Sequence, residues 1–176
     1  DLRRAARAEI PLVPSRKRQP VRTMRDMARI RVSTTIDASP DEVWRAISDI
    51  STHVQWMADA ESIRFHSAQR SGVGTAFDCD TRVGPLRLTD VMEITIWEPG
   101  RRMGVRHVGL VTGEGAFSLR RRRGGRGTRF TWRERLRFPW WLGGPVGGWF
   151  GSILLEFVWR ANLRRLRTQV EAGLTS

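Results

Sequence analysis

Three ionisable residues, Asp90, His107 and Glu134, occur within runs in which apolar and polar residues alternate. Each shares its side of the run with the apolar residues, and successive side chains of a β-strand point to opposite faces of a sheet. We therefore expect all three to face one interior. Ionisable groups inside a protein are costly unless they are paired, so such positions are candidates for function. A histidine beside carboxylates has the chemistry for proton transfer in an aldol-type ring closure or a dehydration.

The sequence thus predicts Asp90, His107 and Glu134 as catalytic residues, with an alternative that assigns them no chemistry. In that alternative the two carboxylates pair with neighbouring arginines or lie in water at strand ends. His107 would then lie at the mouth of a pocket.

Other reactive residues do not form a recognisable site. His53 and His66 are not spaced with Cys79, or with a pair of carboxylates, as metal ligands would be. Cys79 shares a strand face with Phe77 and Thr81, which favours a small buried hydrophobic residue over a nucleophile. The glycine-rich GGPVGGWFG (143–151) does not lead from an apolar strand into a Lys-Ser/Thr helix start, as a phosphate-binding loop does. We therefore expect neither a metal nor a cofactor.

The elements that position the candidate residues begin with a strand in ARIRVSTTID (28–37), where apolar residues recur at every second position. A helix start follows, with Ser39 as N-cap, Pro40 at the first helical position and Glu42 at the capping-box position. We expect a short helix over 40–48 and a second over 51–56. Six further strands are expected near 61–68, 74–82, 86–97, 101–108, 114–122 and 128–137, separated by turn residues. Their short connections favour antiparallel hairpins.

The last predicted element is a helix over 146–172. Its second half is amphipathic, with one apolar stripe that contains Trp159, Leu163, Leu166 and Val170. Its first half is apolar on nearly every side, so it must be covered on more than one face. The order of elements predicts an α+β fold in which a curved antiparallel sheet of seven strands packs against this helix.

Aromatic and methionine side chains dominate the predicted inner faces. A ligand cavity would be lined by Trp56, Phe77, Met92, Met103, Phe117, Phe130, Trp132, Phe150, Leu154 and Phe157. A solid core would have a similar composition, so these residues alone do not distinguish the two.

The formal net charge is +13, and Lys17 is the only lysine among 31 basic residues. We interpret RRRRGGRGTR (120–129) as a solvated hairpin tip; anionic lipid headgroups and nucleic acid are alternatives. Basic residues are not interleaved with aromatic ones, so we do not expect a nucleic-acid partner.

Residues 1–26 are too polar to fold. They predict a disordered basic tail, or sequence upstream of a start at Met24 or Met27, and one domain follows over 27–176. The absence of a signal-peptide pattern and the single cysteine favour the cytoplasm, and the oligomeric state stays open.

The segment FPWWLGGPVGGWFGSILLEFVW (138–159) has the length of a membrane span. Its prolines and glycines, however, leave only about a dozen helical residues before Arg160, where a span needs about 20. We expect a loop over the cavity mouth followed by a helix, with Trp140, Trp141 and Trp149 as a gate. In an alternative, these tryptophans enter a membrane interface while arginines contact anionic headgroups, as a protein peripheral to the membrane would do.

Four segments carry a resemblance to a known family: TTIDASPDEVWRAISDISTHVQWMADAESIRF, GVGTAFDCD, EITIWEPGRRMGVRH and GRGTRFTWRERL. Together they resemble the START-like (SRPBCC) superfamily, which includes bacterial polyketide cyclase/dehydrase and lipid-transport proteins, over residues 30–172. The resemblance implies a helix-grip fold, in which a seven-stranded sheet wraps the C-terminal helix and encloses an apolar cavity. Relatives bind lipids, sterols, polyketides or plant hormones, and some cyclise or dehydrate polyketides. The fold thus implies a class of ligand and little more.

Three functions follow from these observations. The first is a carrier or sensor that encloses a hydrophobic small molecule such as a lipid or a polyketide. The second is a polyketide aromatase/cyclase or dehydratase that uses acid and base groups in the same cavity. The third is a peripheral protein that makes transient contact with anionic membranes.

Overall fold

A computed structural model describes residues 27–122, 127–138 and 144–174, with the backbone alone for 144–152. The predicted tail and the gate residues Trp140 and Trp141 lie outside the described residues. The side chains of Trp149 and Phe150 also lie outside the description.

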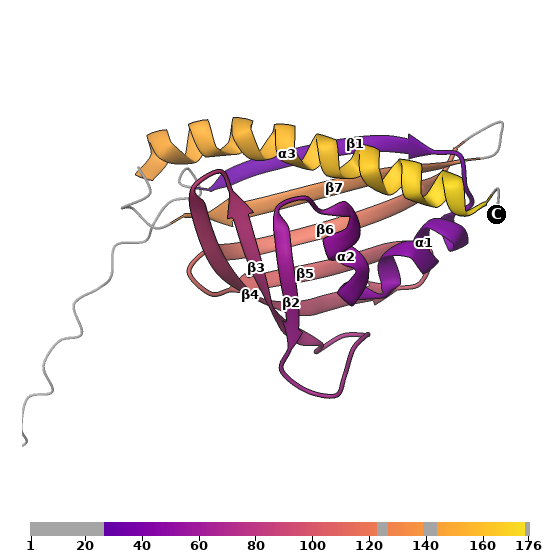
Figure 1. The fold of residues 1–176 in the computed structure, drawn as a ribbon, viewed down its shortest axis with the longest axis horizontal. Helices are drawn as coiled ribbons and strands as arrows, with labels where there is room; N and C mark the ends of the chain where they lie inside the picture. Colours follow the sequence, from indigo (N-terminus) through magenta and orange to yellow (C-terminus); the bar gives the residue numbers. More distant parts are fainter. Residues whose placement is uncertain (1–26, 123–126, 139–143, 175–176) are drawn as a thin grey trace, which may run out of the picture.

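Seven strands form one antiparallel sheet in the order β1-β7-β6-β5-β4-β3-β2 (Figure 1). The strands are β1 (Ala28–Ile36), β2 (Ala60–Phe65), β3 (Ala76–Val83), β4 (Leu86–Glu98), β5 (Arg102–Val108), β6 (Thr112–Arg121) and β7 (Thr128–Arg137). From β2 to β7 each strand pairs with its successor, as short connections predict. β1 pairs with β7, so the helices after β1 carry the chain from one edge of the sheet to the other.

Short helices make this crossing, namely α1 (Pro40–Ser48), the 3-10 turn η2 (Ile50–Thr52) and α2 (His53–Trp56). The capping box predicted for α1 is present: Glu42 N–H donates to Ser39 Oγ at 3.3 Å, and Ser39 N–H donates to Glu42 Oε2 at 2.7 Å. These bonds satisfy amide groups that a helix start leaves without partners. The helix therefore begins where the sequence indicates.

The C-terminal helix, α3 (Gly144–Gly173), runs along the sheet and packs against β1, with α1 and α2 near its C-terminal half (Figure 1). The predicted apolar stripe of that half, Trp159, Leu163, Leu166 and Val170, is buried. A cavity lies between the sheet and α3, which contributes Leu154, Leu155 and Trp159 to its wall.

Candidate functional site

A cavity of about 270 Å³ lies between the sheet, the residues around α2 and the first half of α3. This volume is slightly below the roughly 300–1,000 Å³ that is typical of small-molecule sites. Most of its wall is apolar, including Met57, Ile63, Phe77, Leu88, Met92, Ile94, Met103, Val105, Phe117, Trp132, Leu136, Phe138, Leu155 and Trp159. Leu86, Leu110 and Leu154 also line it and are exposed, which indicates an apolar entrance.

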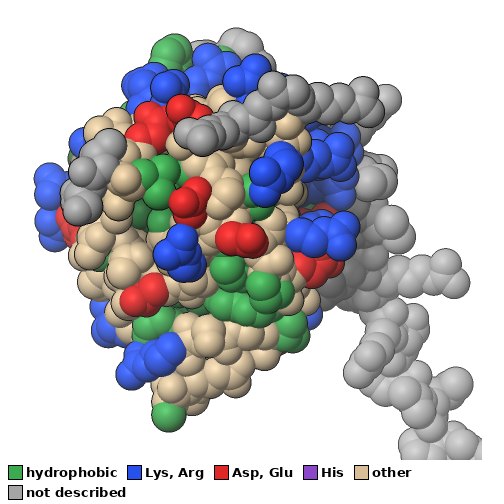
Figure 2. Space-filling model, turned by 90° about the vertical axis from the view of Figure 1, so that its right-hand side faces the viewer, with side chains coloured by type: hydrophobic (Ala, Val, Ile, Leu, Met, Phe, Trp, Pro, Cys, Tyr) green, Lys and Arg blue, Asp and Glu red, His purple; other side chains and the backbone are tan. Residues whose placement is uncertain are grey.

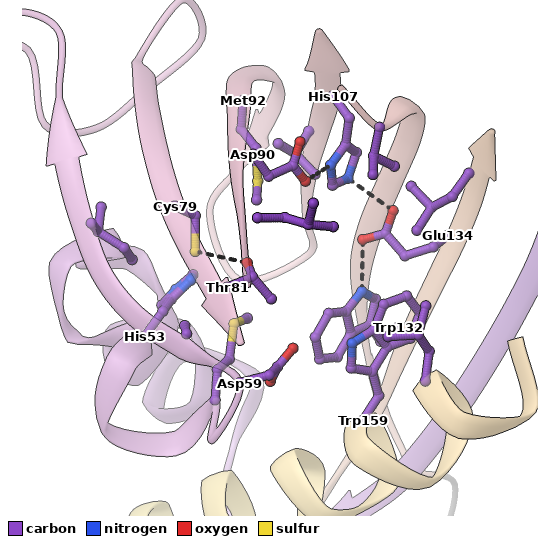
Figure 3. Close-up of a pocket in the computed structure, with 18 of the residues that line it drawn as sticks. His53, Asp59, Cys79, Thr81, Asp90, Met92, His107, Trp132, Glu134 and Trp159 are labelled. Carbon is purple, nitrogen blue, oxygen red and sulfur yellow. Dashed lines mark hydrogen bonds and ion pairs between the residues drawn. The ribbon is translucent and has the colours of Figure 1, made fainter. Parts of the chain in front are cut away.

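The three predicted catalytic residues meet in this cavity and form a hydrogen-bonded chain (Figure 3). His107 Nδ1 lies 2.5 Å from Asp90 Oδ2, and His107 Nε2 lies 3.1 Å from Glu134 Oε2. Trp132 Nε1–H extends the chain by donating to Glu134 Oε1 at 2.8 Å. The side chains of His107, Glu134 and Asp90 are only 7%, 5% and 13% exposed. We call these four residues the polar chain.

Gly115 on β6 leaves the space that the polar chain occupies. His107 and Glu134 belong to β5 and β7, and β6 lies between these strands. Across β6, His107 is paired with Gly113 and Glu134 with Gly115. A Cβ atom added to Gly115 would lie 2.1 Å from Glu134 Oε1, which is far inside van der Waals contact. The side chains of His107 and Glu134 therefore meet over the face of β6 on which Gly113 and Gly115 lie, since neither glycine has a side chain.

Protonation of His107 follows from its two carboxylate partners. Burial by itself would lower the pKa of His107, but the hydrogen bonds to Asp90 and Glu134, together with their negative charges, raise it to about 10. His107 is thus an imidazolium at neutral pH, and both of its N–H groups donate to carboxylates. Asp90 Oδ1 is buried and has no hydrogen-bond partner among the described residues.

One further acidic residue, Asp59, lines the cavity and was not predicted from the sequence, and Asn162 holds it in place. Asp59 follows α2, and its Oδ1 accepts a hydrogen bond of 2.6 Å from Asn162 Nδ2. Asn162 on α3 is fully buried, and its Oδ1 accepts from Ala58 N–H at 2.9 Å. The only feature of the sequence that could have indicated this arrangement is Asn162, a polar residue beside the apolar stripe of α3. Asn162 therefore fixes the turn that holds Asp59 at the cavity.

His53 and Cys79 line the cavity but are poor reagents. Burial lowers the pKa of His53 to about 4, and its Nε2 is 2.8 Å from the carbonyl oxygen of Ile47, so the neutral ring donates to that oxygen. Burial raises the pKa of the Cys79 thiol to about 11. A thiol of this kind is a weak nucleophile, in agreement with the structural role expected from the sequence. Within the described ranges, no group of histidine, cysteine and acidic residues could hold a metal ion.

Six of the predicted pocket residues line the cavity: Phe77, Met92, Met103, Phe117, Trp132 and Leu154. Trp56 and Phe130 do not. Both are fully buried in the core, and their ring centroids lie 6.0 and 5.2 Å from that of Phe117. Phe117 lines the cavity, and Trp56 and Phe130 pack against it. The prediction for Phe157 is wrong, because this side chain is 67% exposed on the outer side of α3.

The curved seven-stranded sheet, the long C-terminal helix and the apolar cavity define a protein with the helix-grip fold. Solved structures share this fold. TTHA0849 from Thermus thermophilus has a TM-score of 0.70 at 19% identity, covering 82% of this chain and 98% of its own. The Zhui aromatase/cyclase from Streptomyces sp. R1128 has a TM-score of 0.69 at 13% identity, with 84% and 96% covered. A START superfamily protein from Mycobacterium smegmatis has a TM-score of 0.66 at 13% identity, with 82% and 97% covered.

Residues 27–171 match the family described as polyketide cyclase/dehydrase and lipid transport, and the chain belongs to that family. Membership supports a role in binding a hydrophobic ligand or in cyclisation. Comparison with curated proteins gives no match. Among the described helices, none is long and apolar enough to cross a bilayer.

Proposed function

We propose that this protein binds a hydrophobic small molecule, of lipid or polyketide type, in the cavity and acts as its carrier or sensor. The apolar wall with an exposed apolar entrance at Leu86, Leu110 and Leu154 carries this proposal. Transfer of apolar surface from water into such a wall contributes about 25 cal/mol per Å². A few polar groups in a mostly apolar pocket are the usual arrangement for orienting a ligand.

The proposal is tested by identifying what the protein carries. Native mass spectrometry of protein purified from its own source, followed by extraction, should reveal a bound apolar molecule. A cavity-filling variant, Val105→Trp, should lose that molecule, because Val105 lines the cavity. Val73→Trp is the matched control, since Val73 is exposed and outside the wall. Equal retention by the two variants, or no bound molecule in the unmodified protein, would count against the proposal.

The polar chain favours a second candidate function, a polyketide cyclase or dehydratase. Ring closure joins a methylene carbon, which loses a proton to a base, to a ketone carbon, whose oxygen takes a proton from an acid. Dehydration then removes that oxygen as water together with a neighbouring proton. The His107 imidazolium has the proton to give, and a carboxylate of Asp90 or Glu134 has the lone pair to accept one.

Turnover separates the two functions. If the protein is an enzyme, it should convert a poly-β-ketone to a cyclic product, and His107→Gln should lower kcat by roughly 10²-fold or more, as loss of a positioned acid does. Apolar probes should still bind this variant, and circular dichroism should confirm that it is folded. Binding of the poly-β-ketone without conversion would leave the carrier as the function that the cavity supports.

A further inference from the structure

The charges inside the cavity are opposite in sign to the charge of the chain as a whole. The formal net charge of the protein is +13. Among the described residues that line the cavity there is no arginine and no lysine, although the chain has 31 such residues. The charged lining residues are instead Asp59, Asp90, Glu134 and the His107 imidazolium. At the end of the molecule beyond α1, by contrast, acidic and basic side chains are interspersed on the surface (Figure 2).

The charges of the three carboxylates and the imidazolium do not sum to zero. His107 offsets one of its two carboxylate partners, and His53 contributes no charge because it is neutral at pH 7. The formal charges therefore leave the cavity with two excess negative charges. Glu134 is buried, and Asp59 and Asp90 are half-buried. Uncompensated charge in a mostly apolar cavity carries a desolvation cost, which a bound cation would offset.

Asp59 is the carboxylate best placed to contact such a cation. Its Oδ1 is held by Asn162, which leaves Oδ2 without a partner among the described residues. The carboxylate is turned toward Trp132 and Trp159, whose rings stack at 4.5 Å between centroids (Figure 3). Asp59, Trp132 and Trp159 all line the cavity. A cavity that offers a carboxylate and indole rings is a favourable setting for an ammonium group, which is attracted both by the charge and by the aromatic rings.

We propose that the cavity selects an apolar ligand that carries an ammonium group, with Asp59 as its contact, and that it discriminates against carboxylates. The inference rests on the proposed ligand-binding function and names the class of ligand. An anionic amphiphile would place its charge near three carboxylates and a single imidazolium. A neutral donor such as a hydroxyl group can bind Asp59 or the free Asp90 Oδ1 without that repulsion, and is expected to rank between the two.

Three probes of one shape test this order: 2-naphthylmethylamine, 2-naphthylmethanol and 2-naphthoate, titrated calorimetrically at pH 7 and fixed salt. The amine should bind at least about tenfold more tightly than the carboxylate, the minimum expected for one charge-assisted hydrogen bond. The preference should persist in large part at high salt, because a half-buried pair is screened less than a surface pair. Equal or tighter binding of the carboxylate overturns the inference and leaves the proposed function intact. Failure of all three probes to bind counts against both.

The variant Asp59→Asn tests whether Asp59 is the residue that contacts the ammonium group. It removes the negative charge but keeps an amide oxygen that can still accept the hydrogen bond from Asn162. This variant should weaken binding of the amine by about tenfold and change binding of the alcohol by less than about threefold. Asp37→Asn removes the same charge from an exposed position and should change neither. Equal losses in the two variants would overturn the role of Asp59. If Asp59→Asn does not fold, the order of the three probes on the unmodified protein still decides the charge preference.

Discussion

His107 on β5 and Glu134 on β7 form a hydrogen bond of 3.1 Å across β6, although their strands are not neighbours in the sheet. The bond has room because Gly115 occupies the position of β6 opposite Glu134, where a Cβ atom would lie 2.1 Å from Glu134 Oε1. The polar chain therefore depends on a residue that takes no part in its chemistry. This dependence makes Gly115 the most direct means of testing the chain without altering its members.

Gly115→Ala should disrupt the polar chain. The new methyl group would lie 2.1 Å from Glu134 Oε1, so the carboxylate must leave its place beside His107. We expect a loss of about 1–3 kcal/mol in the free energy of unfolding, the usual cost of overpacking. Chemical denaturation measures it. Gly173→Ala is the control, because a Cβ at Gly173 meets nothing within 4 Å. Equal stability of the two variants would show that Glu134 moves away freely.

Asp90→Asn should lower the pKa of His107. The substitution removes one of the two carboxylates that raise this pKa to about 10, while burial continues to lower it. NMR titration of the imidazole measures the change. Asp78→Asn is the matched control, because Asp78 binds His66 near the surface and should leave His107 unaffected. A pKa of His107 that is the same in both variants would contradict the coupling.

The two buried histidines should give the protein a stability maximum near pH 6.5. His107 has a folded-state pKa of about 10 against 6.5, so its contribution is complete below pH 6.5 and is lost as the pH rises through 10. His53 has a folded-state pKa of about 4, so its contribution is complete above pH 6.5 and is lost as the pH falls through 4.

Urea unfolding across pH 4–10 checks this profile. His53→Gln keeps a donor toward the carbonyl of Ile47 but cannot be protonated, so it should flatten the acid side of the profile and leave the alkaline side unchanged. If the stability of His53→Gln falls as steeply with decreasing pH as that of the unmodified protein, the loss of stability in acid is caused by carboxylates and not by His53.

Much of the fold could be predicted from the sequence because its signals are local. Alternation predicted the strands and the inward face of Asp90, His107 and Glu134, and the capping residues predicted the start of α1. What could not be predicted depends on contacts between distant segments. The face of β6 on which Gly113 and Gly115 lie matters only because of the strand order, and Gly113 was expected to belong to a turn. It lies in β6, which begins at Thr112.

The positions of Asp59 and Phe157 also could not be predicted from local sequence patterns. Asp59 follows a four-residue helix, where no periodicity indicates direction, and it is placed by Asn162 from far along the chain. Phe157 lies in an apolar helical segment that the pattern alone predicts to be covered, yet it is exposed. Burial of a helix face depends on what packs against it, which the helix sequence does not contain.

Phe157 and Phe130 should therefore respond very differently to truncation. Phe130→Ala removes a fully buried ring and should cost about 3–5 kcal/mol of stability. Phe157→Ala removes an exposed ring and should change stability by less than about 0.5 kcal/mol. Thermal unfolding of the two variants measures the contrast. A large loss for Phe157→Ala would mean that its ring is covered in solution.

Cys79 offers a site-specific probe of the cavity, since it is the only cysteine and lines the wall. Burial raises the pKa of its thiol to about 11, and the thiolate is the form that reacts. Alkylation by iodoacetamide at pH 8 should therefore be slow in the native protein and fast after unfolding in urea. A bound naphthyl probe should slow it further, because the ligand would cover the same wall. Mass spectrometry follows the reaction, and rapid native labelling that is unaffected by the probe would mean that the thiol is reached from outside the cavity.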